Sequence, residues 1–208
     1  DAKSSLALEV DDFKLSLVGG TATLKSTTPS SIESSENGKR YKVGLDVIGV
    51  PDGREVLTIN PVDNNIYDDA ANPANKIQDN NSMNLFDKQP PVITNVNLSK
   101  ANDTLFVTLS EAAYAKESGT GALVTSDFTL SIVNGFSKLT NPNPSSVTNL
   151  GSNVYALTFG ISGTPDGREE LFIVPSSNSI FDASGNIAAT KQSNNSVYLN
   201  DQKAPTAP

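Results

Sequence analysis

The 208-residue sequence contains no cysteine, no histidine and no tryptophan. Disulfides and thiolate sites are therefore excluded, as are imidazole metal ligands and the usual general base at neutral pH. Lysine and arginine number 15 against 23 acidic residues, and the resulting net charge of −8 disfavours binding to nucleic acids and to anionic membranes. No apolar run approaches the roughly 18 residues that a membrane span requires. Hard cations, which oxygen ligands bind, are not excluded.

The sequence does contain an internal repeat. Pro51-Asp52-Gly53-Arg54-Glu55 returns as Pro165-Asp166-Gly167-Arg168-Glu169, with matching residues on both sides. Phe13 aligns with Phe128, an offset of 115 residues by subtraction. A repeat of this length can bury its own core and has the size of an immunoglobulin-like sandwich.

The segments around the repeated motif alternate between apolar and polar residues. Residues 41–47 and 155–161 have a period of two before the motif, and residues 56–61 continue it afterwards. Proline, aspartate and glycine are the residues that tight turns favour. We therefore predict that the motif closes a hairpin, with Arg54 and Glu55 forming a solvated charge pair at its mouth.

Short strand-like segments recur along the whole chain, and no segment has helical periodicity. Residues 92–98 and 105–109 are predicted to be the first two strands of the second repeat, and the first repeat has no counterpart of them. The polar stretches after Pro29 and Pro144 are predicted to be loops.

These patterns predict an all-β chain of two tandem immunoglobulin-like β-sandwich domains. The first domain spans residues 1–90, and the second spans residues 91–208 and ends in a linker. The first lacks its N-terminal two strands within this chain. We expect its sandwich to be open, or to be completed in cis by upstream strands or in trans by strands that a neighbouring subunit donates.

Four stretches resemble bacterial immunoglobulin-like repeats: Ser110-Glu111-Ala112, residues 119–128, residues 180–186 and residues 203–206. Such repeats occur in very large surface proteins, including adhesins, surface-layer-associated proteins and the cyanobacterial swimming-motility type. The resemblance covers nearly the whole chain. It implies a non-catalytic structural or extender segment of an adhesin, filament or sheath, located outside the cell or on the bacterial cell surface. The implied partners are adjacent copies of the repeat in cis or neighbouring subunits in trans.

A carbohydrate- or ligand-binding β-sandwich module of a secreted protein is the alternative. Such a module would concentrate aromatic and polar differences in one copy, whereas the aromatic content is only 6% and the copies are alike, which favours the extender. Tyr67 and Phe181, at a shared position, would stack on a surface glycan if exposed, but we expect them to plug the end of the sandwich. Asp52 and Glu55 would be the best acid pair of a glycosidase. They lie in one turn that occurs twice, so no enzyme is predicted.

Calcium is the one cofactor that the composition suggests, because Ca²⁺ takes six to eight oxygen ligands. The segment 63–68 imitates the start of an EF-hand loop but lacks its glycine and its acidic twelfth residue. Similarity to repeat arrays that calcium makes rigid adds Glu111, close to the second strand, and the linker residues Asp87 and Asp201. The candidate calcium ligands are Asp63, Asp68, Asp87, Glu111, Asp182 and Asp201. The favoured alternative for the loop residues is an Asx turn, in which each carboxylate caps its own loop.

Overall fold

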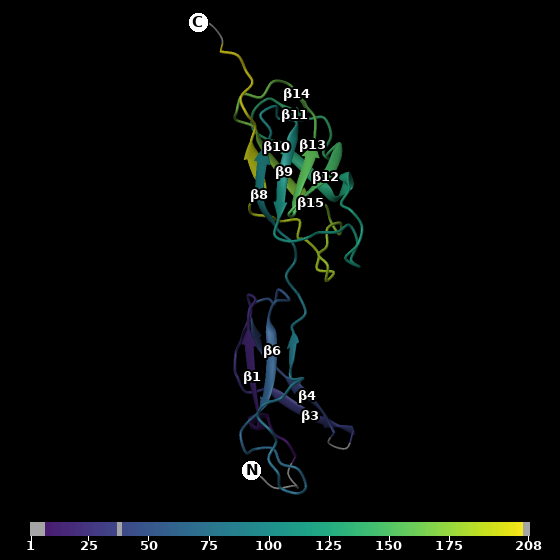
Figure 1. The fold of residues 1–208 in the computed structure, drawn as a ribbon. Coiled ribbons are helices and arrows are strands. Elements are labelled where there is room, and N and C mark those ends of the chain that lie inside the picture. Colours follow the sequence, from purple (N-terminus) through teal and green to yellow (C-terminus); the bar gives the residue numbers. More distant parts are fainter. Residues whose placement is uncertain (1–6, 37–38, 206–208) are drawn as a thin grey trace. The chain divides into compact units, whose positions relative to one another are not determined.

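The computed structural model describes residues 7–36 and 39–205. The chain divides into two compact units, unit 1 (residues 1–89) and unit 2 (residues 90–208) (Figure 1). Among the described residues, the elements with defined bounds are antiparallel strands, together with the short 3-10 turns η1 (Val10–Asp12) and η3 (Thr125–Asp127), so the all-β prediction is confirmed. Among the described residues, no helix is long and apolar enough to cross a membrane.

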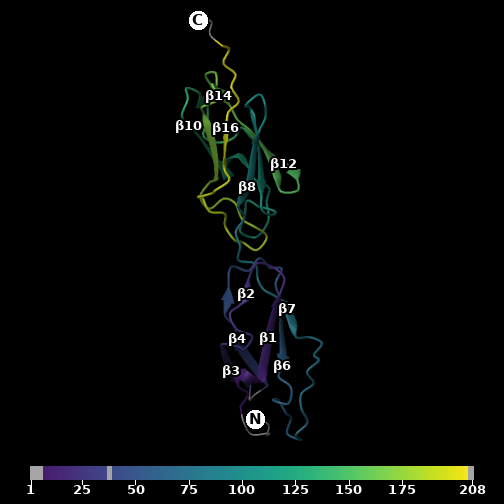
Figure 2. The same cartoon turned by 90° about the vertical axis from the view of Figure 1, so that its left-hand side faces the viewer.

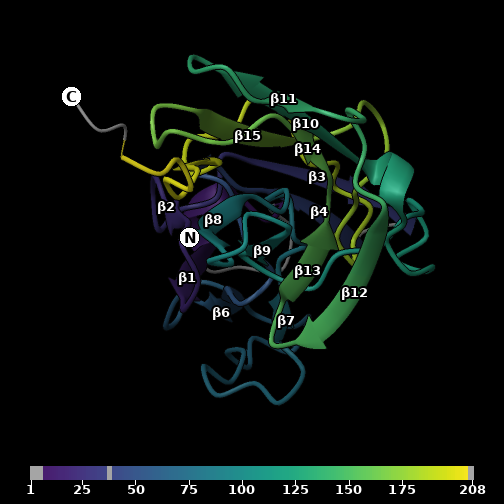
Figure 3. The same cartoon turned by 90° about the horizontal axis from the view of Figure 1, so that it is seen from above.

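Unit 2 is a two-layer β-sandwich, whose layers are separated in the view of Figure 3. Its strands are β8 (Ile93–Leu98), β9 (Thr104–Leu109), β10 (Phe128–Val133), β11 (Lys138–Leu139), β12 (Ser146–Gly151), β13 (Val154–Thr158), β14 (Ile161–Ser162), β15 (Glu170–Pro175) and β16 (Ser196–Tyr198). One sheet has the order β12-β13-β9-β8 and the other has the order β10-β15-β16, while β11 and β14 form a short pair. This matches the division of a constant-type immunoglobulin sandwich, in which strands A, B, E and D face strands C, F and G.

The core of unit 2 lies between these two sheets. In β9, Leu105, Val107 and Leu109 are buried and alternate with half-buried residues, as the period of two predicts. From the opposite sheet, β15 contributes Leu171 and Ile173, which are fully buried in the same cluster. Burial of such side chains is the main stabilising contribution to the unit.

Unit 1 repeats the later strands of unit 2 in the same order. Its strands are β1 (Phe13–Val18), β2 (Thr23–Leu24), β3 (Ser31–Ser35), β4 (Arg40–Gly44), β5 (Val47–Ile48), β6 (Val56–Pro61) and β7 (Ser82–Asn84). They pair as β1-β6-β7, β3-β4 and β2-β5, and Figure 2 shows β1 beside β6. The register is also shared, because Phe13 pairs with Pro61 just as Phe128 pairs with Pro175.

Unit 1 has no counterpart of β8 and β9 among its described residues. Consequently β4 pairs only with β3, whereas its counterpart β13 pairs with both β12 and β9. The core side chains are less covered: Phe13 and Leu57 are half-buried, but their counterparts Phe128 and Leu171 are fully buried. The prediction that the first sandwich lacks its N-terminal two strands is confirmed for the described part of the unit.

Two local predictions are wrong. The repeated motif does not close a hairpin: β5 before it pairs with β2, whereas β6 after it pairs with β1 and β7, so the motif connects strands of different sheets. The stretches after Pro29 and Pro144 are the strands β3 and β12, not loops. They are polar because each is an edge strand with one pairing partner and mostly exposed residues.

Candidate functional site: the motif loops and the pocket of unit 2

We call residues 51–55 and 165–169 the motif loops, and each is organised by its buried final glutamate. Glu169 is fully buried, and its Oε1 accepts hydrogen bonds from the backbone N–H groups of Phe136 and Ser137, both at 3.1 Å. Its Oε2 accepts the N–H of Asp166 at 3.0 Å. Glu55 of unit 1 is also fully buried and accepts the equivalent N–H groups, which belong to Thr21, Ala22 and Asp52. The prediction that this glutamate forms an exposed ion pair with its arginine is therefore wrong.

A glycine makes room for each buried carboxylate. A Cβ atom at Gly135 would lie 2.3 Å from the carboxyl carbon of Glu169, and at Gly20 it would lie 2.2 Å from that of Glu55. Both glycines also have positive φ, +56° and +60° respectively, which disfavours other residues. Only glycine lets the backbone approach the carboxylate this closely.

The buried glutamates keep their charge because hydrogen bonds outweigh the effect of burial. Burial acts to raise the pKa of Glu169, but the N–H groups of Ser137, Asp166 and Phe136 lower it, and the net pKa lies below the ordinary value of 4.5. The pKa of Glu55 is lowered in the same way against the effect of burial. An ionised carboxylate that accepts several N–H bonds is a strong internal brace.

The arginine of each motif loop pairs with the aspartate two residues before it. In unit 2, Arg168 Nε donates to Asp166 Oδ2 at 3.0 Å, and a second bond to the same oxygen comes from Nη2. The bond from Arg168 is the main reason that the pKa of Asp166 lies below its ordinary value. Asp52 and Arg54 make the same pair in unit 1. The aspartate and arginine of the motif thus pair with each other within their own loop.

Each motif loop also fixes the C-terminal segment of its unit. In unit 2, the N–H of Leu199 donates to the carbonyl oxygen of Glu169, and the N–H of Gln202 donates to that of Pro165, both at 2.9 Å. Unit 1 repeats both bonds, at 3.0 and 2.9 Å, from Leu85 to Glu55 and from Lys88 to Pro51. The loop therefore ties together the segment after β1 or β10, its own turn and the segment that leaves the unit.

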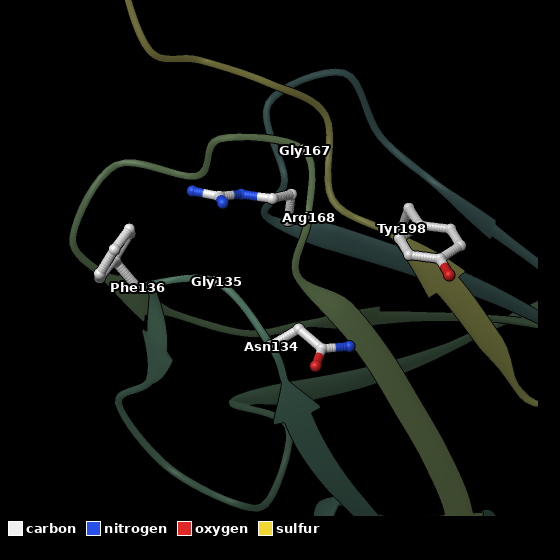
Figure 4. A pocket seen from close by; sticks show the side chains of 6 residues that line it. All are labelled: Asn134, Gly135, Phe136, Gly167, Arg168 and Tyr198. Carbon is white, nitrogen blue, oxygen red and sulfur yellow. The ribbon is translucent and has the colours of Figure 1, made fainter.

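Beside the motif loop of unit 2 lies a pocket of about 540 Å³. It is lined by Asn134, Gly135, Phe136, Gly167, Arg168 and Tyr198. Figure 4 shows Phe136 and Tyr198 on opposite sides, with the side chains of Arg168 and Asn134 between them. The two aromatic side chains are 74% and 60% exposed, and the Arg168 guanidinium carbon lies 5.7 Å from the centroid of the Phe136 ring.

At this pocket the two units differ in aromatic content. The residues that correspond to Phe136 and Tyr198 in unit 1 are Thr21 and Asn84. The pocket was not predicted from the sequence, because the two copies were regarded as alike. The available signal was the gain of two aromatic residues in one copy, at positions that the topology places next to the same loop.

Two of the predicted calcium ligands lie close together in unit 2. Carboxylate oxygens of Glu111 and Asp182 approach within 4.8 Å. Asp182 is fully buried; its Oδ1 accepts the N–H groups of Ser184 and Asn186, and its Oδ2 accepts the Asn186 side-chain amide. These bonds from the residues two and four positions later are of the Asx-turn kind.

The other four predicted ligands make local contacts. Asp63 pairs with Lys76 across 3.7 Å. Asp68 accepts four hydrogen bonds from Ala70 and Asn72, an arrangement of the Asx-turn kind. In the segments that leave each unit, Asp87 Oδ1 accepts the N–H of Gln89 and Asp201 Oδ1 accepts that of Lys203, both at 2.8 Å.

Tyr67 and Phe181 are half-buried, and each forms an isolated β-bridge within its own turn, to Pro73 and to Ile187. Phe181 is also bridged to Tyr114 by two backbone hydrogen bonds, of 2.7 and 2.8 Å.

Comparisons of the chain with protein-family models, curated proteins and solved structures found no match.

Proposed function

We propose that this chain is a structural, non-catalytic segment of tandem modules in an extracellular bacterial surface protein such as an adhesin, filament or sheath. The observation that supports this role is the duplicated motif loop. Its buried glutamate, its ion pair and its two bonds to the segment that leaves the unit recur in both units. In a tandem array each module must hold the segment that leads to the next module, and these contacts hold that segment in place.

The best candidates for catalytic carboxylates are engaged in this brace. Glu55 and Glu169 are fully buried and accept backbone N–H groups, while Asp52 and Asp166 are paired with arginine. A glycosidase needs two carboxyl groups that reach the substrate on either side of the scissile bond. The motif loops do not offer such a pair, which supports a structural role.

The role predicts that the protein is displayed outside the cell. Antibodies raised against this chain should label intact cells that produce the protein, and brief protease treatment of those cells should remove the label. On a denaturing gel the same antibodies should detect a polypeptide much larger than 21.9 kDa, the mass of this chain. A cytoplasmic antigen that resists protease in intact cells would contradict the proposal.

The proposal includes calcium at the Glu111 and Asp182 carboxylates of unit 2, where oxygen donors of the kind that calcium prefers are close together. Calcium at a hundred times its dissociation constant should then stabilise the native state by about 2.7 kcal/mol. Thermal melts with calcium and with chelator test this, and Glu111→Gln should abolish the difference. Asp63→Asn is the matched control, since Asp63 pairs with Lys76. Superimposable curves for the unaltered chain would remove calcium from the proposal.

A further inference from the structure

Beyond the structural role, we propose that the pocket formed by Asn134, Phe136, Arg168 and Tyr198 in unit 2 binds a neutral sugar ring. The pocket volume of about 540 Å³ lies within the range of small-ligand sites. Its walls combine two exposed aromatic rings with polar side chains. This is the combination that recognises a pyranose, which has C–H faces and hydroxyl edges.

The aromatic side chains supply the apolar contact. Phe136 and Tyr198 are exposed in a chain that has only 13 phenylalanine and tyrosine residues in total, eight and five respectively. Neither belongs to the buried core cluster of unit 2. Exposed rings that gather around one depression indicate a binding surface. The C–H face of a sugar can stack on these rings without disturbing any contact of the core.

Hydrogen-bond donors stand between the rings. Arg168 directs Nε and Nη2 to Asp166, and no described residue of the chain accepts a bond from its Nη1. The side-chain amide of Asn134 likewise makes no hydrogen bond within the described residues. These groups can donate to sugar hydroxyl oxygens, and the Asn134 carbonyl can accept a hydroxyl hydrogen.

The charge of the pocket favours a neutral ligand. The Arg168 guanidinium is already paired with Asp166. Glu169 lies beneath the loop, and Glu170 is the cross-strand partner of Tyr198. Two carboxylates, those of Asp166 and Glu169, thus act on the Arg168 guanidinium and offset its charge, so an anionic sugar gains little attraction at this pocket.

The brace described above holds the pocket in shape before any ligand arrives. The backbone of Phe136 is fixed by its bond to Glu169, and the Arg168 side chain is fixed by Asp166 and lies against the Phe136 ring. Pre-organised groups lose less conformational entropy on binding. Unit 1 has the same brace without the aromatic residues, so it is a natural control within one molecule.

The test uses the full chain and saturation-transfer NMR with the methyl glycosides of glucose, galactose, mannose and N-acetylglucosamine, and with methyl glucuronide as the anionic probe. At least one neutral glycoside should bind, with a dissociation constant of about 1 mM, through its ring protons. Phe136→Thr and Tyr198→Asn install the residues of unit 1, and each should weaken that binding about tenfold. Both positions are exposed, so neither change should alter the melting temperature.

Leu150→Asn, at an exposed position of β12 away from the pocket, is the matched control and should leave sugar binding unchanged. Thr21→Phe together with Asn84→Tyr should create a second binding event in unit 1. The proposal is overturned if no neutral glycoside receives saturation, if both pocket variants bind as well as the unaltered chain, or if only the glucuronide binds. Each of these outcomes is independent of the cell-surface test above.

Discussion

Replacement of Glu169 by alanine should destabilise unit 2 by about 3 kcal/mol, because three backbone N–H groups lose the charged acceptor that satisfies them. That loss is a large fraction of the stability of an ordinary domain, which is about 5 to 15 kcal/mol. Urea denaturation, followed by the near-ultraviolet signal of the tyrosines, measures it. Glu170→Ala is the control, since this neighbouring side chain accepts one bond, from Ser196, and should cost well under 1 kcal/mol. Equal losses for the two variants would contradict a bracing role.

The same carboxylate should make unit 2 sensitive to acid. Because the pKa of Glu169 is lower in the folded state than its ordinary value of 4.5, the unfolded chain takes up the proton first as the pH falls. The contribution is complete above about pH 4.5 and declines as the pH drops through the folded pKa. The lowered pKa of Asp166 acts in the same direction, whereas the raised pKa of Asp127, which burial causes, acts in the opposite direction. Glu169→Gln should be less stable at pH 7 and lose less stability between pH 5 and pH 3.

Unit 1 should unfold well before unit 2. The strands β8 and β9 bring five large buried side chains to the core of unit 2: Ile93, Val96, Leu105, Val107 and Leu109. At roughly 1.5 to 3 kcal/mol each, their absence from unit 1 removes about 8 to 15 kcal/mol, which is an upper estimate. Hydrogen exchange followed by mass spectrometry should therefore show low protection in peptides from residues 13–61 and high protection in peptides from residues 128–175. Equal protection of the two sets would show that unit 1 is stable without these strands.

A gain-of-stability variant sharpens this prediction. A copy of residues 90–115 joined ahead of Asp1 continues the alignment of the repeats, since Asp1 corresponds to Lys116 at the offset of 115. The added strands should pair with the open edge of β4 and raise the protection of unit 1 by at least tenfold. Gln78 already matches Gln192, whose Oε1 accepts the N–H of Ile93 at the start of β8. A copy in which the five buried residues are replaced by serine is the control and should give no gain.

The alternation of side chains was sufficient to predict the main strands of the core. Leu105, Val107 and Leu109 have the predicted burial, and the repeat in sequence corresponds to a repeat in structure, since β1 pairs with β6 as β10 pairs with β15. Such segments are predictable because a half-buried strand imposes a period of two on its own residues. The absence of two strands from unit 1 was predictable by comparison of the two copies, because the alternating segments 92–98 and 105–109 have no counterpart in the first copy.

The sequence was less informative where a long-range contact decides the structure. Turn residues indicate a turn but do not determine whether the flanking strands pair, so they cannot distinguish the crossing between sheets at residues 51–55 from a hairpin. Glu55 was predicted to be a surface charge, because two of the backbone N–H groups that it accepts, those of Thr21 and Ala22, lie 34 and 33 residues away in the sequence. One clue was present: the glutamate is retained in both copies, while the next residue changes from Val56 to Glu170.

The two bonds that tie the departing segment to the motif loop also matter when the chain is under tension. The last strand, β16, pairs with β15 over only three residues, and a strand that short would peel away easily on its own. Before a pull on residues 203–205 reaches β16, it must break the bond from Gln202 to Pro165, the bonds between Asn200 and Asn102, and the bond from Leu199 to Glu169. Because the same loop is held by a buried carboxylate, the load is shared with the backbone at Phe136 and Ser137, more than 30 residues earlier in the chain.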